Sequence, residues 1–407
     1  MAKKKKTLKV LKQEDARPYG RDEHLDSGGM GKKRNLSDRF CDRPWTWMEI
    51  DSYGRVNTCC PAWLPTVIGN LTESSFEEVW NSDKAKELRK SILDGSFSHC
   101  VQEACPYIQS DSLPLVKDIL THKHPKEISN HDKLIAPFKQ AETLREILKS
   151  KSVVAEVPLS YNLCYDESCN LRCPSCRSSF INFSDEETEE FKKRKRIQDA
   201  ILQKVFSKPN NRFIKLNITG SGDPFGSKLF RELLETLDGK NFPGLEINLQ
   251  TNGVLFTENT WDRMKKLHDN IMVTLVSFDA ATEETYNYTR NGGNWKKLLE
   301  NMYFICSLRA DKNVKMREVR VDFVVQERNY QEMGDFVELI TTEYPEVDSI
   351  YFSLITDWGT YPAEEFKKHA IWKKEHPDFD KFVKMLKEDA RISHPKVDLG
   401  NLSEYKK

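Results

Sequence analysis

From about residue 153 onward, short apolar segments alternate with longer amphipathic segments. The short segments are rich in β-branched residues, which indicates strands, and the longer ones carry an apolar stripe at helical spacing. Strands are expected at 153–163, 213–219, 245–249, 271–278, 319–325 and 350–354. Helices are expected near 190–206, 226–238, 258–268, 294–310 and 330–343. Strands that alternate with helices predict a parallel α/β sheet, closed partly or wholly into a barrel.

The residues ahead of this region follow a different pattern. Apolar residues on both sides of 51–54 predict two short strands around a glycine turn at Gly54. A helix is expected from Ser74 or Ser75, which would cap it, to about Leu93. Further helices are expected around 141–148 and near 380–389. This segment therefore predicts a small α+β unit in front of the barrel.

These patterns divide the chain into five parts. Residues 1–38 are rich in Lys, Arg, Gly and Asp without an apolar period, which predicts a flexible basic arm. The small α+β domain is expected at 39–107, a connector at 108–150, a partial (β/α)6 TIM-like barrel at 151–362 and a C-terminal extension at 363–407. In a sheet of this kind the chemistry lies on loops at the carboxyl ends of the strands.

Charge and hydropathy exclude several classes of partner. The chain has 63 basic and 63 acidic residues, so no overall field attracts nucleic acid or a membrane surface. The Lys3–Lys6 run is interpreted as a solubilising tail rather than a nucleic-acid contact. No apolar run is long enough to span a membrane, and no secretory signal is found. We therefore expect a cytoplasmic protein with neither membrane nor nucleic acid as its partner.

Ten cysteines in an intracellular chain indicate metal or redox chemistry more than disulfides. Cys169, Cys173 and Cys176 follow the first expected barrel strand at CxxxCxxC spacing. Iron–sulfur cubes are usually held by four thiolates, so three from one loop leave one iron open to a ligand. The alternative is a structural zinc site or three unrelated buried thiols. Zinc favours paired CxxC units, and no second pair lies nearby.

The segment Cys169-Asn-Leu-Arg-Cys173-Pro-Ser-Cys176 resembles the signature loop of the radical S-adenosylmethionine (SAM) enzymes. The resemblance implies a 4Fe–4S cluster on the three cysteines, with SAM on the fourth iron. It also implies that one electron cleaves SAM to a 5′-deoxyadenosyl radical, which abstracts hydrogen from a substrate. The chain departs from the family at Ser175, where an aromatic residue is usual.

Later strand ends carry segments that resemble other family motifs, over residues 153 to 360. The segment 220–224 is similar to the Gly-Gly-Glu-Pro motif that binds the methionyl amine, with an aspartate in place of the glutamate. The resemblance implies that the following residues hold the cofactor: Gly220, Ser221, Gly222, Asp223, Asn252, Ser277, Asp279 and Arg290. Gln326 and Trp358 are candidates to face the substrate.

A second group of cysteines precedes the barrel. Four thiolates are enough to give every iron of a 4Fe–4S cluster a protein ligand. They are supplied by Cys41, Cys59, Cys100 and Cys105. The arrangement is similar to a twitch module, half of a SPASM domain, which implies a second, auxiliary 4Fe–4S cluster. A zinc site on the same thiols is the alternative.

Three cysteines remain outside these two sets. Cys60 could replace Cys59 as a ligand of the auxiliary cluster. Cys164 is interpreted as a buried thiol, with a hydrogen-atom donor as the catalytic alternative. Cys306 is expected in the core, because it falls in the middle of an expected helix.

The leading hypothesis is a radical SAM enzyme with an auxiliary cluster that transfers electrons. Its reaction would be oxidation, cross-linking or epimerisation of an unidentified peptide, sugar or small metabolite. An electron donor such as flavodoxin or ferredoxin is the expected protein partner. The competing hypothesis is a non-catalytic iron–sulfur or zinc scaffold that binds a partner. A nucleic-acid-modifying role is a third hypothesis and depends only on the basic tail.

Overall fold

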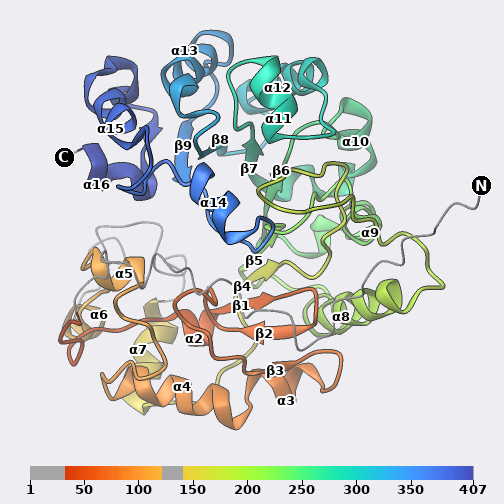
Figure 1. Ribbon diagram of the computed structural model, residues 1–407. Coiled ribbons are helices and arrows are strands. Elements are labelled where there is room, and N and C mark those ends of the chain that lie inside the picture. Colours follow the sequence, from red (N-terminus) through yellow and green to blue (C-terminus); the bar gives the residue numbers. More distant parts are fainter. Residues whose placement is uncertain (1–32, 122–140, 407) are drawn as a thin grey trace, which may run out of the picture.

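The computed structural model describes residues 33–121 and 141–406. Its centre is one sheet in the order β10-β9-β8-β7-β6-β5-β4-β1-β2-β3. The strands β4 to β9 are parallel, and helices connect them in sequence (Figure 1). The predicted α/β fold with a partly closed barrel is therefore confirmed. Most of the expected basic arm, residues 1–32, lies outside the described residues.

The barrel elements agree with the predicted pattern. Its strands are β4 (Ser160–Leu163), β5 (Ile214–Ile218), β6 (Leu245–Thr251), β7 (Ile271–Ser277), β8 (Glu318–Val325) and β9 (Ser349–Leu354). Its helices are α8 (Glu189–Val205), α9 (Lys228–Thr236), α10 (Glu258–Arg263), α11 (Glu283–Thr289), α12 (Trp295–Ala310) and α13 (Met333–Glu343). Short 3-10 helices η4 (Gly239–Asn241), η5 (Lys265–Asn270) and η6 (Tyr330–Glu332) complete the connections.

The first barrel strand is shorter than predicted, because residues 153–159 do not join the sheet. Val154 is 57% exposed. The carbonyl oxygen of Val153 accepts a hydrogen bond from Arg89, and that of Ala155 accepts one from Asn81. These backbone groups bind the N-terminal domain, so the segment runs along that domain instead of pairing as a strand.

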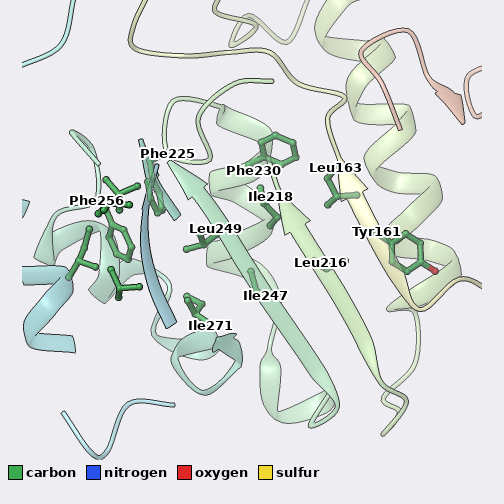
Figure 2. Close-up of a cluster of buried hydrophobic side chains, with 14 of the residues drawn as sticks. Tyr161, Leu163, Leu216, Ile218, Phe225, Phe230, Ile247, Leu249, Phe256 and Ile271 are labelled. Carbon is green, nitrogen blue, oxygen red and sulfur yellow. The ribbon is translucent and has the colours of Figure 1, made fainter. Parts of the chain in front are cut away.

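The barrel core lies between the sheet and the helices. In β5 and β6 alternate residues are buried, as expected for strands with one face on a core. Figure 2 shows this apolar layer, in which Leu216 and Ile218 of β5 lie beside Ile247 and Leu249 of β6. Phe230 of α9 packs on the ring of Tyr165 at 4.9 Å. The opposite, concave face of the strands is left for polar side chains.

The N-terminal domain consists of short elements around a separate core. They are α2 (Arg43–Thr46), β1 (Trp47–Ile50), β2 (Arg55–Asn57), β3 (Gly69–Asn70), α3 (Phe76–Trp80), α4 (Asp83–Leu93), α5 (Pro106–Gln109), α6 (Val116–Thr121) and α7 (Ala141–Ser150). The hairpin of β1 and β2 is confirmed, and Gly54 has a φ of +80° at its turn. The single helix expected from 74 or 75 to 93 is instead two helices, capped by Ser75 and Ser82.

Arg89 holds this domain together. Its side chain is fully buried and donates hydrogen bonds to the carbonyl oxygens of Pro44 and Trp80, which belong to two other helices. The side chain of Asn81 and the carbonyl oxygen of Val153 accept two more. Four acceptors on three separate segments thus satisfy one guanidinium, which fixes α4 against its neighbours.

The N-terminal core extends beyond the boundaries expected from the sequence. Leu36, within the expected arm, is 5% exposed and packs in this core. Ile119 and Leu144, within the expected connector, pack in the same core. The described parts of 108–150 therefore belong to the N-terminal domain by their packing, while residues 122–140 lie outside the described residues.

The strand β1 makes the two domains share one sheet. It pairs in parallel with β4, so that Glu49 lies opposite Asn162 and Ile50 opposite Leu163. The sequence pattern predicted a separate hairpin, because pairing between distant strands leaves no local signal. As a result, the cysteine-rich segments before and after β1 are fixed next to the barrel.

The C-terminal extension packs at the β9 end of the barrel sheet. Its elements are α14 (Ala363–His369), α15 (Phe379–Glu388), η7 (Ala390–Ser393), β10 (Val397–Asp398), η8 (Gly400–Leu402) and α16 (Ser403–Lys406). The strand β10 pairs in parallel with β9. In Figure 1, α14 lies between the barrel and the N-terminal domain. None of the helices in the described residues is long and apolar enough to cross a membrane.

Candidate cluster-binding sites

The cysteine loop leaves the carboxyl end of β4 and is fixed by buried polar side chains. Asp166 is fully buried; its carboxylate accepts hydrogen bonds from Ser168 N at 2.9 Å and from Ser227 Oγ at 2.6 Å. Arg177 donates to the carbonyl oxygens of Glu167 and Ser221, both at 2.6 Å. The loop with the three predicted cysteines is therefore tied to the glycine-rich loop after β5.

The three thiols of this loop lie in different environments. Cys173 is buried, Cys169 is partly exposed and Cys176 is exposed. Burial raises the pKa of Cys169 to about 12, and burial also raises the pKa of Cys173, against the opposing charge of Arg290. Thiols bind metals as thiolates, so metal binding here must release protons. Three thiols on one fixed loop fit the three protein ligands of a cluster with one open iron.

The glycine-rich loop packs directly against the cysteine loop. A side chain at Gly222 would lie 2.6 Å from the carbonyl oxygen of Ser168, so only glycine fits there. A side chain at Gly220 would lie 3.7 Å from Cys164 Sγ. Ser221 Oγ donates a hydrogen bond to the carbonyl oxygen of Cys164 at 3.0 Å. The close approach explains why small residues follow β5.

Asp223 has a structural environment that the sequence did not indicate. Its carboxylate is fully buried and accepts four hydrogen bonds, from the backbone N–H groups of Phe225, Gly226 and Asn252 and from Thr251 Oγ1. Burial raises the pKa of Asp223, and these donors oppose that shift. A carboxylate has about four lone-pair sites, so the protein itself satisfies it. Its side chain joins the end of β6 to the loop after β5.

Asn252 and Arg290 also point to the cysteine loop. Asn252 Nδ2 donates to Asn170 Oδ1 at 2.9 Å and lies 3.8 Å from Cys169 Sγ. Arg290 Nη1 lies 3.9 Å from Cys173 Sγ, and Nη2 forms an ion pair of 2.8 Å with Asp279. Asp279 has a φ of +60° and accepts a hydrogen bond from Val324 N. The structure thus brings these predicted residues together around the cysteines.

Ser277 lies in a different position from those residues. It is the last residue of β7 and pairs in register with Asp322 of β8. It therefore lies on the concave face, next to the ion pair of Asp322 with Arg320 at 2.6 Å.

The four N-terminal cysteines gather at one apolar cavity. Its wall includes Cys41, Cys59, Cys100 and Cys105, together with Arg43, Trp63 and Tyr107. Burial raises the pKa of Cys59 to about 11 and that of Cys100 to about 12. No group of three or more His, Cys, Asp or Glu side chains in the described residues has the arrangement of a single-ion site. Four thiols around a cavity fit a polynuclear cluster.

Cys60 and Cys164 take no part in this cavity wall. Charge on Cys60 and on Glu49 raises the pKa of Cys164, although burial is the main cause. Burial and Glu49 likewise raise the pKa of Cys60 to about 12. The two thiols and this carboxylate therefore lie near one another. Cys59 and not Cys60 lies with the other three thiols, and Cys306 is buried in the core as expected.

A row of polar side chains crosses the concave face of the sheet. Glu49, Asn162, Asn217 and Asn248 pair in register across β1, β4, β5 and β6. Asn162 Nδ2 donates to Glu49 Oε2 at 3.1 Å, and Asn248 Nδ2 donates to Asn217 Oδ1 at 3.0 Å. The sequence analysis missed this row. The sequence signal for this row was the alternation of polar and apolar residues within these strands, which places the polar side chains on one face of the sheet.

The loops after β8 and β9 lie at the same end of the sheet. Gln326 is 2% exposed, and its side-chain oxygen has no hydrogen-bond partner among the described residues. Trp358 is 54% exposed. His369, at the end of α14, is 6% exposed, and its carbonyl oxygen accepts a hydrogen bond from Glu327 N. The helix α14 thus covers the carboxyl end of β8.

Comparison with known families matches two parts of the chain. Residues 41–106 match the SPASM iron–sulfur cluster-binding domain, and residues 167–322 match the Radical SAM superfamily. None of the curated proteins matches the chain. The first match contains the four thiols of the N-terminal cavity, and the second contains the cysteine loop with the loops after β5, β6 and β7.

Proposed function

Because this chain belongs to the radical SAM superfamily and carries an auxiliary-cluster domain, we propose that it oxidises a polar substrate by removal of a hydrogen atom, an electron and a proton. Cys169, Cys173 and Cys176 would hold the cluster that binds SAM, and the four N-terminal thiols would hold the auxiliary 4Fe–4S cluster. When bound, the first cluster and SAM supply a 5′-deoxyadenosyl radical as the hydrogen acceptor.

The observation that carries this proposal is the shared sheet. The pairing of β1 with β4 places the segments that carry both sets of thiols next to one continuous sheet. Cys60 follows Cys59 of the N-terminal cavity, Cys164 contacts the loop after β5, and Glu49 interacts with both of these thiols. A substrate bound at this place would face the cysteine loop on one side and the N-terminal cavity on the other, so that its electron could leave toward the cavity.

The polar row from Glu49 to Asn248 provides a surface on which such a substrate could bind. Asn162, Asn217 and Asn248 offer amide donors and acceptors, and the partly exposed Glu49 offers a carboxylate. A substrate with hydroxyl, amine or amide groups fits this surface, which includes peptides, sugars and polar metabolites. Glu49 would accept the proton that leaves with the electron. Burial raises its pKa, which brings the carboxylate toward the range of a general base.

The loops around the cysteines would hold the cofactor. The backbone of Gly220, Ser221 and Gly222 is the candidate for the methionyl amine, because the Asp223 carboxylate is already satisfied by four protein donors. Asn252 and Ser277 are candidates for polar contacts with SAM. Arg290 forms an ion pair with Asp279 and lies against Cys173. We propose that Arg290 also binds the carboxylate of SAM.

Cys164 supports epimerisation as a second candidate reaction. Burial raises its pKa, so it stays a thiol, and a hydrogen-atom donor requires an S–H bond. A substrate radical that takes a hydrogen atom from Cys164 is epimerised instead of oxidised. The thiyl radical left on Cys164 would return to the thiol by taking one electron from the external donor and one proton. Replacement of Cys164 by serine would then abolish the product and leave SAM cleavage intact.

The experiment is anaerobic reconstitution followed by metal analysis and a SAM cleavage assay. We expect about eight irons per chain, and 5′-deoxyadenosine after addition of SAM and dithionite. A one-electron donor such as flavodoxin or ferredoxin should replace dithionite. The control is the triple variant C169A/C173A/C176A, which should keep about four irons and form no 5′-deoxyadenosine. Full iron loading without 5′-deoxyadenosine, or zinc in place of iron, would favour the non-catalytic scaffold.

A further inference from the structure

Arg43 lies against the four N-terminal thiols and forms no close ion pair with a carboxylate of the described residues. It lines the same cavity as Cys41, Cys59, Cys100 and Cys105. Among the described residues it forms no ion pair, and Tyr107 Oη at 3.0 Å is the side-chain acceptor for its guanidinium. A cation in an apolar cavity wall is costly unless a negative charge compensates it. The thiolates of this cavity could supply this charge, in addition to the neighbouring Asp42 carboxylate.

Aromatic side chains fix the guanidinium in this position. Its carbon lies 4.3 Å from the ring centre of Trp47 and 5.4 Å from that of Tyr107. Such stacking suits the planar guanidinium of arginine more than the ammonium of lysine. Burial lowers the pKa of Arg43, but charge on Tyr107, Cys59, Asp42 and Cys41 raises it overall. The cation is thus held where it interacts with the thiols.

Several N–H groups point at the same sulfurs. Trp63 Nε1 donates to Cys59 Sγ at 3.2 Å. The backbone N–H of Arg43 lowers the pKa of Cys41, and those of Ile108 and Tyr107 lower the pKa of Cys105, against the burial that raises both pKa values. Hydrogen bonds to cluster sulfurs and nearby positive charge both stabilise the more negative, reduced state of an iron–sulfur cluster.

We propose that Arg43 is the counter-cation of the auxiliary cluster and, together with Trp63, raises its reduction potential so that it can accept an electron. This inference depends on the proposed function, because it requires a cluster on the four thiols. Arg43 acts through the cluster and does not touch the substrate, so it is a positioning residue. This role of Arg43 explains how the auxiliary cluster could accept an electron from the substrate radical instead of donating one.

The test uses the variant C169A/C173A/C176A as background, so that the auxiliary cluster gives the spectroscopic signal. The midpoint potential is measured by a redox titration followed by electron paramagnetic resonance. We expect R43Q to shift the potential to a more negative value, with R43K closer to the parent because it keeps the charge. W63F should also shift the potential to a more negative value, because it removes one N–H donor and keeps an aromatic ring.

Each outcome separates the inference from the proposed function. If the background variant binds no iron, the auxiliary cluster and hence the proposed function fail. If R43Q keeps about four irons and the parent's potential, the role of Arg43 fails and the proposed function stands. Loss of iron in R43Q that R43K does not share supports a counter-cation that the cluster requires. Loss shared by R43K overturns the inference in favour of a packing role.

Discussion

At the scale of single residues, charged side chains around the cysteine loop are bound mainly by the protein itself. Arg177 joins the cysteine loop to Ser221, and Arg290 joins Cys173 to Asp279. Asp223 joins the loop after β5 to the end of β6. These contacts fix the loops before any cofactor binds. Less conformational entropy is therefore lost when the cofactor binds.

Replacement of Asp223 by asparagine tests this structural role. The new amide group would face N–H donors where a carboxylate oxygen now accepts them. We expect the free energy of unfolding to fall by about 3 kcal/mol, measured by denaturant titration of the iron-free protein. Ser307 is a matched control, because it is exposed and its Oγ donates only to the local Phe304 carbonyl oxygen. S307A should leave stability nearly unchanged.

The alternative role for Asp223 gives a different result. If its carboxylate binds the methionyl amine, as the family resemblance implies, D223N would lose SAM binding without a loss of stability. Equilibrium binding of SAM to the reconstituted variant, compared with its unfolding curve, separates the two roles.

At the scale of elements, α14 is the segment that covers the carboxyl ends of the strands. Phe366 packs with Ile355 and Ala370 beside the end of β9. The ring of His369 lies 4.4 Å from that of Tyr361, and its Nδ1 has no partner among the described residues. A buried imidazole in this setting is stable only in its neutral form. The attachment of α14 should therefore depend on pH.

The pH dependence follows from the pKa of His369. Burial lowers it from the ordinary value of 6.5; Glu327 and Glu365 oppose the shift, and Lys368 and His376 reinforce it. The unfolded chain then binds the proton at higher pH than the folded chain does. Stability is fully present above about pH 6.5 and is lost as the pH falls toward the folded-state pKa.

We expect hydrogen exchange in α14 to increase between pH 7.5 and pH 5.5, after correction for the intrinsic exchange rate. H369F should remove this increase, because phenylalanine keeps the ring and cannot take up a proton. Amides of α12, on the outer side of the barrel, provide the internal reference. Equal pH dependence in H369F and the parent would assign the effect to another group.

At the scale of the whole molecule, the N-terminal domain completes the barrel sheet. Removal of β1 would expose the backbone edge of β4, and unpaired strand edges promote aggregation. We expect a chain of residues 151–407 to aggregate or to unfold at lower temperature than the intact chain. Size-exclusion chromatography and thermal unfolding measure both effects. Co-expression with residues 33–150 should restore a monodisperse complex. A well-behaved barrel alone would show that the shared sheet is not required for folding.

The sequence determined most of the barrel elements and predicted which residues carry the chemistry. Alternating apolar and amphipathic segments predicted the strands β5 to β9 because side-chain periodicity is a local property. The spacing of Cys169, Cys173 and Cys176 predicted their shared loop for the same reason. The family matches confirm the radical SAM domain and the auxiliary-cluster domain. The roles of the individual cofactor-binding residues remain predictions.

Only the tertiary structure decided how distant segments meet. The pairing of β1 with β4, the polar row from Glu49 to Asn248 and the position of Arg43 at the thiol cavity join residues far apart in the chain. No local period encodes such contacts. The environment of Asp223 is a further example, because its four donors come from two loops that meet only after folding. The sequence predicts which cysteines bind the clusters, and long-range packing determines what surrounds those cysteines.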